Sequence, residues 1–221
     1  MKISKQDVIV SKENIESAII VAERAARVCY NSVEKQTGKL EDAVKFLKNL
    51  IGLHHTSVLE HCNITAEFHT NIGVSREFER HRHTHFGFKG ELCTGFSERS
   101  TRYCNYGKDS KYPDGVEFCP SVVFIEKLAN DGNLEAYEEF LSGAEENYLD
   151  MLKRGYKAQE ARSLLPLCTK TVFIATANLR EWRWIMELRT SNAAHPDIIE
   201  LMTIFKEKLF EAVPQIEPLF E

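Results

Sequence analysis

Two stretches of this chain have the pattern of β-strands, and they lie far apart in the sequence. In residues 62–71, Ile64, Ala66 and Phe68 alternate with polar residues, and residues 168–177 contain the β-branched and aromatic run Thr171-Val172-Phe173-Ile174. Alternation with a period of two residues, and enrichment in such side chains, are the sequence signals of strands. Any sheet that the chain forms is therefore expected to be small.

Helical patterns occupy most of the remaining sequence. Apolar side chains recur at helical spacing near residues 14–28, 40–52, 74–83, 133–154, 157–164, 178–190 and 196–212. No internal repeat and no linker rich in Pro, Gly or Ser divides the chain. These observations predict a single α+β domain over residues 1–221, in which helices pack on a small mixed or antiparallel sheet.

The composition excludes several classes of protein. The chain of 221 residues is 43% hydrophobic and 28% charged, with a formal net charge of −5 at pH 7. This acidic balance argues against a protein that coats nucleic acid or a membrane surface. No apolar run reaches the roughly 18 residues of a membrane span, and the N-terminal segment lacks the apolar core of a signal peptide. We therefore expect a cytoplasmic protein.

The cysteines and histidines do not predict a metal site. The six cysteines are scattered without a CxxC pair, which favours reduced thiols over a zinc knuckle or a disulfide framework. Seven of the eight histidines lie between His54 and His85, but there is no HExxH motif, and His81 and His83 flank an arginine. Neither GxGxxG nor GxxxxGK[ST] is present, so Rossmann and P-loop nucleotide binding are not expected.

Two basic blocks in the middle of the chain suit a phosphorylated small molecule. Arg80-His81-Arg82 ends a predicted helix, on which Arg76 and Arg80 form a like-charge pair that a bound anion would relieve. The second block, residues 97–103, places Ser and Thr hydroxyls between arginines. Guanidiniums bind phosphate oxygens in pairs, and hydroxyls add single hydrogen bonds.

The first block also has a purely structural interpretation. It could be a solvated helix in which Glu79 pairs with Arg82 and Glu77 pairs with His81. These residues by themselves do not decide between the two interpretations.

Residues 178–189 leave a similar choice open. Asn178, followed three residues later by Glu181, is typical of a helix N-cap with a capping box. Arg189 lies on the same helix face as Trp182 and Met186, so it is either a charge that points into a pocket or a last-turn cation that the helix dipole favours. Arg162 is likewise either a charge that points into a pocket or a cation with a purely structural role.

Several sequence blocks, taken in order, resemble those of the flavin-dependent thymidylate synthases. The resemblance spans residues 24 to about 198 and is carried by Arg24–Tyr30, His55–His61, Arg80-His81-Arg82, Ser100–Tyr106, Ala161–Pro166, Asn178–Arg180 and Glu187–Arg189. It implies an α+β homotetramer with active sites shared between subunits. The implied reaction is the reductive methylation of dUMP to dTMP, with FAD as cofactor, NADPH as reductant and 5,10-methylenetetrahydrofolate as carbon donor.

The resemblance also implies roles for individual residues. The positions that match cofactor-binding residues are Ser57, Arg80, His81, Arg82, Glu98, Asn178 and Arg180, with His55 and Glu60 beside them. The positions that match dUMP-binding residues are Glu77, Arg80, Ser100, Arg102, Arg162 and Arg189. Arg189 matches the catalytic arginine that polarises the uracil ring; a fixed cation there would stabilise the charge that develops on the ring.

The chain departs from the family pattern at several positions. Glu77 replaces a glutamine, His85 a serine, Trp184 an asparagine, and Ala193 lies near a usual histidine; the loop at residues 86–97 is longer. These changes leave open a related flavin and folate enzyme that modifies C5 of a pyrimidine nucleotide differently, for example by hydroxymethylation. A non-catalytic nucleotide- or RNA-binding module is the other alternative, although the acidic charge and the lack of interleaved aromatic residues weigh against it.

Overall fold

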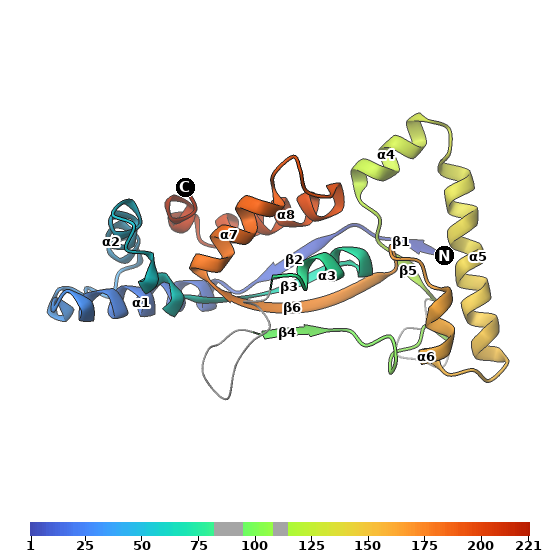
Figure 1. Cartoon of the computed structure of the whole chain (residues 1–221), viewed down its shortest axis with the longest axis horizontal. Coiled ribbons are helices and arrows are strands. Elements are labelled where there is room, and N and C mark those ends of the chain that lie inside the picture. Colours follow the sequence, from blue (N-terminus) through green and yellow to red (C-terminus); the bar gives the residue numbers. More distant parts are fainter. Residues whose placement is uncertain (82–94, 108–114) are drawn as a thin grey trace.

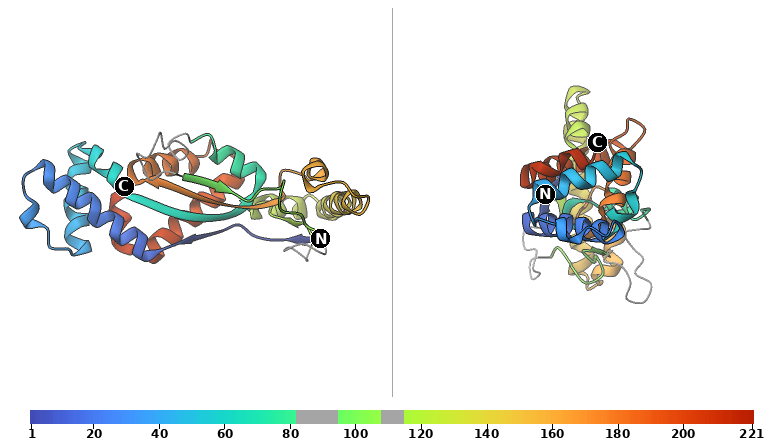
Figure 2. Two further views of the ribbon diagram at one scale, coloured as in Figure 1. Left: turned by 90° about the horizontal axis from the view of Figure 1, so that it is seen from below. Right: turned by 90° about the vertical axis from the view of Figure 1, so that its left-hand side faces the viewer.

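A computed structural model describes residues 1–81, 95–107 and 115–221 of the chain. The molecule is elongated, with a sheet in the middle and helices at both ends (Figures 1 and 2). Arg82, His85 and most of the predicted 86–97 loop lie outside the described residues.

A four-stranded antiparallel sheet forms the centre, in the order β2-β3-β6-β4. Its strands are β2 (Asp7–Val10), β3 (Asn63–Asn71), β6 (Lys170–Asn178) and β4 (Gly95–Glu98). The two long strands are those predicted from the sequence, and they pair along their whole length, with Phe68 opposite Phe173. Two short strands, β1 (Lys2–Ile3) and β5 (Glu117–Phe118), form a separate parallel pair.

Helices account for most of the other described residues. They are α1 (Lys12–Cys29), α2 (Leu40–Gly52), α3 (Ile72–Phe78), α4 (Val122–Asn130), α5 (Leu134–Lys153), α6 (Ala158–Ala161), α7 (Leu179–Arg189) and α8 (Pro196–Ala212). Short 3-10 helices lie at Val33–Lys35, Thr56–His61, Arg162–Leu164 and Pro214–Leu219. These elements confirm the prediction of one mixed domain with packed helices and a small antiparallel sheet.

Two helix predictions need correction, and one helix lies outside the predicted ranges. The predicted helix at 74–83 begins earlier, at Ile72, and ends at Phe78. The predicted helix at 157–164 divides into α6 and a 3-10 turn. Helix α4 was not predicted, because its first four residues are all apolar and show no helical period; the Ser121 hydroxyl nevertheless caps it by accepting a hydrogen bond from the backbone N–H of Phe124.

The main core lies between the sheet and the helices on one of its faces. Phe68 stacks on Phe173 with ring centroids 4.8 Å apart and also contacts Phe78 and Phe205. Trp182 of α7 is fully buried in this core, and its indole N–H donates to the carbonyl of Ile64 at 3.0 Å. The aromatic cluster therefore fixes α3, α7 and α8 against the two central strands.

A smaller core joins α5 to the rest of the molecule. Tyr106, Val116, Phe118, Leu141 and Tyr148 are all buried there.

In the described ranges, no helix combines the length and the apolar composition that a membrane crossing requires.

Phe68→Ala should lower the free energy of unfolding by about 3–5 kcal/mol, because it leaves a cavity among four aromatic neighbours that cannot all move inward. Urea denaturation followed by circular dichroism measures the change. Phe140→Ala is the matched control, because Phe140 is 61% exposed. If the two variants lost equal stability, the sheet–helix aromatic cluster would not be the core.

Candidate functional site

Asn71 sets the position of α3. Its side-chain Oδ1 accepts a hydrogen bond from the N–H of Val74 at 2.9 Å, which caps the helix. Its Nδ2 donates to the carbonyl of Cys119 at 2.8 Å and to Oδ2 of Asp197 at 3.1 Å. One buried amide thus joins the end of β3 to the start of α8, and this arrangement directs the end of α3 toward α7.

The end of α3 meets the end of α7 through an arginine–histidine contact. Arg189 Nε donates to His81 Nε2 at 2.8 Å, and Arg189 Nη2 donates to the carbonyl of Glu77 at 3.3 Å. These contacts bring together three residues that the sequence predicted for the site.

His81 is held in its neutral form. Burial, and then the neighbouring charge of Arg189, lower the pKa of His81 to about 4. Because a guanidinium only donates hydrogen bonds, Nε2 is the acceptor and the imidazole proton is on Nδ1. Nδ1 lies 4.0 Å from a carboxylate oxygen of Glu181. The imidazole therefore orients Arg189 without neutralising its charge.

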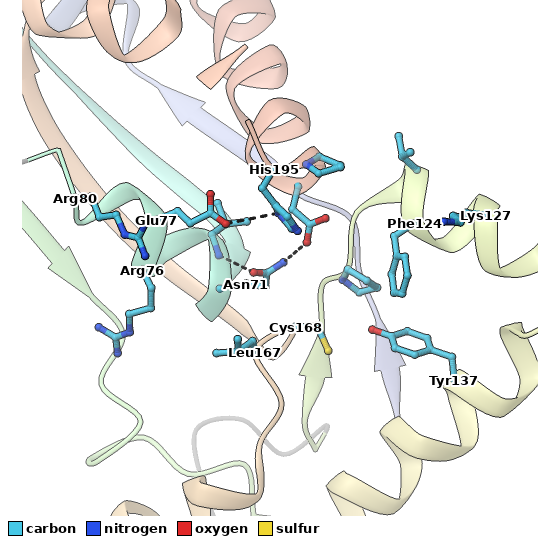
Figure 3. Close-up of a pocket in the computed structure, with 16 residues that line it drawn as sticks. Asn71, Arg76, Glu77, Arg80, Phe124, Lys127, Tyr137, Leu167, Cys168 and His195 are labelled. Atoms are coloured by element: carbon cyan, nitrogen blue, oxygen red, sulfur yellow. Dashed lines mark hydrogen bonds and ion pairs between the residues drawn. The ribbon is translucent and has the colours of Figure 1, made fainter. Parts of the chain in front are cut away.

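A pocket of about 720 Å³ opens beside α3; we call it the α3–α8 pocket (Figure 3). Glu77 points into it toward His195, with 3.6 Å between Glu77 Oε1 and His195 Nδ1. Aromatic rings of α4 and α5 form the opposite wall, where Phe124 and Tyr137 meet edge to face. The residues that line this pocket are Asn71, Gly73, Val74, Arg76, Glu77, Arg80, Pro120, Val123, Phe124, Lys127, Tyr137, Leu167, Cys168, His195, Pro196 and Asp197.

A second pocket, of about 800 Å³, lies along α7; we call it the α7 pocket. Arg180 Nη1 donates to Glu60 Oε1 at 2.7 Å and so joins α7 to the 3-10 helix at Thr56–His61. Asn178 Oδ1 accepts from the N–H of Glu181 at 2.9 Å, which confirms the predicted N-cap. The lining residues are Thr56, Glu60, Asn178, Arg180, Glu181, Arg183, Trp184 and Glu187.

The residues that the sequence predicted for the cofactor are divided between several places. Asn178, Arg180 and Glu60 line the α7 pocket. His55 and Ser57 lie at the adjoining 3-10 helix, where the Nδ1 of His55 hydrogen-bonds to the hydroxyl of Tyr30. Glu98 lies on β4, where it accepts from the hydroxyl of Thr171 at 3.0 Å. Arg80 lines the α3–α8 pocket, and Arg82 lies outside the described residues.

The residues predicted for dUMP form two groups on different elements. Glu77, Arg80 and Arg189 lie where α3 and α7 end. In the other group, Ser100 and Arg102 follow β4, and Arg162 belongs to the 3-10 helix at Arg162–Leu164. Arg162 Nη1 donates to the hydroxyl of Thr101, between Ser100 and Arg102, at 3.1 Å. Each group contains at least one guanidinium.

The structure corrects one of the two ion pairs expected for a solvated helix: the carboxylate of Glu77 faces His195 rather than His81. Glu79 pairs with Arg76 at 2.9 Å, and Arg82, the partner expected for Glu79, lies outside the described residues. Arg76 also lies 3.8 Å from Glu98, so two carboxylates offset its repulsion of Arg80.

Sequence reasoning missed several lining residues. Asn71 and His195 are examples; each precedes a helix, and Asn71 could have been recognised as an N-cap. Nothing in the local sequence indicates that His195 faces Glu77.

Within the described residues, no three His, Cys, Asp or Glu side chains gather in a way that could hold a metal ion, and the described cysteines are free thiols.

Comparisons with known proteins identify the family. A family model described as thymidylate synthase complementing protein matches residues 12–215. Flavin-dependent thymidylate synthases of Mycolicibacterium vanbaalenii and Mycobacterium tuberculosis are both 31% identical to this chain, over 206 and 207 residues, covering 91% of it and 79% of each relative. The chain belongs to the flavin-dependent thymidylate synthase family.

Membership of the flavin-dependent thymidylate synthase family confirms the resemblance seen in the sequence and the prediction of an enzyme of this class. It disfavours a non-catalytic binding module. The fold is similar to that of UMP/dUMP methylase PolB from Streptomyces cacaoi, whose crystal structure contains 5-Br dUMP; the TM-score is 0.71, with 18% identity, over 98% of this chain and 95% of that one.

Acid should destabilise the protein partly through His81. The histidine pKa is about 6.5 in an unfolded chain but is lowered in the fold, so between about pH 6.5 and pH 4 the unfolded state binds a proton that the folded state does not. The free energy of unfolding therefore falls as the pH falls through this range. His81→Gln should show a smaller decrease between pH 7.5 and pH 5 in urea denaturation.

His61→Gln is the control, because His61 is exposed and should behave as the wild type does. An equal pH dependence in the wild type and His81→Gln would contradict a buried neutral imidazole.

Proposed function

We propose that the protein catalyses the reductive methylation of dUMP to dTMP, with 5,10-methylenetetrahydrofolate as the carbon donor and FAD, reduced by NADPH, as the hydride source. Family membership over residues 12–215 supports this proposal, and so does the fold shared with a UMP/dUMP methylase. The observation that carries it is the convergence of Arg189 and His81 on Glu77, which lines the α3–α8 pocket. His81 also lies 4.0 Å from Glu181, which lines the α7 pocket.

The α7 pocket fits a flavin cofactor. Its volume of about 800 Å³ is within the range of ligand sites, and it combines hydrogen-bonding side chains with the exposed indole of Trp184. Asn178, Arg180 and Glu60 would hold the cofactor, with His55 and Ser57 at the adjoining 3-10 helix. When bound and reduced, flavin supplies the hydride, and the protein supplies binding and orientation.

The nucleotide would contact both groups of predicted dUMP-binding residues. Arg102, Arg162 and Ser100 offer the mixture of guanidiniums and hydroxyl that suits a phosphate. Glu77, Arg80 and Arg189 would contact the rest of the nucleotide from α3 and α7. The family resemblance implies active sites shared between subunits, and we propose that the two groups complete one site across subunits of a homotetramer.

Arg189 would stabilise charge on the uracil ring. Its Nε–H and one Nη2–H are used by His81 and by the carbonyl of Glu77, which fixes the plane of the guanidinium. The remaining N–H groups are available to a ligand. Since both partners are neutral, the full positive charge of Arg189 faces the developing negative charge on the pyrimidine.

Arg189→Lys should retain dUMP and FAD binding but lower the rate about a hundredfold or more, because an ammonium cannot replace a planar fork that is held at two points. Single-turnover oxidation of the pre-reduced, dUMP-bound enzyme, with and without methylenetetrahydrofolate and with thymidylate quantified, measures this. Near-normal turnover would mean that Arg189 is only a last-turn cation.

The same assay in the wild type tests the proposed reaction. Formation of thymidylate supports it, whereas a different C5-modified product would favour the alternative that Glu77 and the longer 86–97 loop leave open. Absence of any product from dUMP would overturn the proposal.

Arg102→Ala should weaken dUMP binding by about ten- to a hundredfold and leave FAD binding nearly unchanged, because a charged hydrogen bond to phosphate is lost. Calorimetric titration of each ligand into the variant separates the two effects. Equal losses for dUMP and FAD would identify Arg102 as a structural residue.

A further inference from the structure

The two tryptophans of the chain have opposite environments on the same helix. Trp182 is fully buried and hydrogen-bonded to Ile64, whereas Trp184 is 50% exposed. Residues two positions apart lie about 200° apart around a helix, so they occupy opposite sides of α7. The core contacts of α7 come from Leu179, Trp182, Ile185 and Met186, and packing therefore does not require an indole at position 184.

Trp184 forms part of the wall of the α7 pocket. It lies four residues after Arg180 and so on the same helix face, and both residues line the pocket with Glu60, the ion-pair partner of Arg180. A large aromatic surface left half exposed on a pocket wall is available to a planar ligand, because stacking would remove it from water.

The charged residues of the α7 pocket favour a neutral aromatic ring of a ligand, rather than a phosphate group, beside Trp184. Among the described residues, the lining has three carboxylates, Glu60, Glu181 and Glu187, against two guanidiniums. One guanidinium, Arg180, is paired with Glu60, and the other, Arg183, donates to the carbonyls of Leu219 and Glu221. These described side chains therefore give a pyrophosphate no guanidinium that lacks a partner, whereas a neutral heteroaromatic ring requires none.

We propose that Trp184 stacks on a planar ring of the bound flavin cofactor and so contributes to cofactor affinity; this inference depends on the proposed function. The ring is either the isoalloxazine or the adenine of FAD, since both are flat and both can stack on an indole. An amide side chain at this position can form hydrogen bonds but provides no such surface.

The test measures affinity by equilibrium dialysis of FAD, riboflavin and ADP against the wild type, Trp184→Ala, Trp184→Phe and the control Phe140→Ala. Trp184→Ala should weaken FAD binding by about three- to tenfold, as expected for loss of one aromatic stack. Trp184→Phe should restore most of the affinity, and Phe140→Ala, which alters an exposed ring on α5, should leave it unchanged. Whichever of riboflavin and ADP loses affinity in Trp184→Ala identifies the stacked ring.

Tryptophan emission provides a second readout that does not depend on activity. Acrylamide, a neutral quencher, should reach Trp184 but not the buried Trp182. Saturating FAD should lower the fraction of the emission that acrylamide quenches, because a stacked ring covers Trp184 and quenches it; we call this decrease protection by FAD. Trp184→Phe should show little quenching with or without FAD. Urea denaturation of each variant confirms that it is folded.

The outcomes separate the two proposals. If the wild type binds FAD, but Trp184→Ala binds it as tightly as Phe140→Ala does and FAD gives no protection, the stacking proposal is wrong and the proposed function stands. If the folded wild type binds no FAD, both are overturned. Weaker binding in Trp184→Ala, rescue in Trp184→Phe and protection by FAD together support stacking.

Discussion

The antiparallel pairing of β3 with β6 determines where the site forms. Asn71 lies opposite Lys170 at one end of this ladder, and Asn63 lies opposite Asn178 at the other. Helix α3 follows β3 and α7 follows β6, so the two helices begin at opposite ends of the same pair of strands. Both turn back over the same face, and their C-terminal ends approach each other above the sheet (Figure 1).

The lengths of the elements make that meeting possible. Nine paired residues span about 30 Å, while the seven residues of α3 and the eleven of α7 together span about 27 Å. The helices therefore end almost in contact. Side chains near their ends, His81 and Arg189, bridge the remaining gap. A fully paired ladder and an aromatic core beneath it thus fix the position of Arg189, the residue proposed to be catalytic.

The electrostatics at the meeting point are consistent with that arrangement. The carbonyl groups at a helix end lack partners within the helix and attract cations. Arg189 donates a further hydrogen bond to the carbonyl of Glu77 while it occupies the last turn of its own helix. Its other partner, His81, is a neutral imidazole because burial disfavours the charged form. The structural and functional interpretations of Arg189 are therefore compatible, since the contacts that anchor the guanidinium leave its charge available.

The sequence by itself determined the two central strands, most of the helices, the cap at Asn178 and the family. These features depend on local periodicity, on hydrogen bonds a few residues apart, or on the order of short blocks. Only the tertiary structure decided that Glu77 faces His195, that Arg189 rests on His81, and that the predicted cofactor and nucleotide residues occupy separate places. Such contacts join residues far apart in the chain, and they exist only because the β3–β6 register and the lengths of α3 and α7 bring those residues together; no local pattern carries that information.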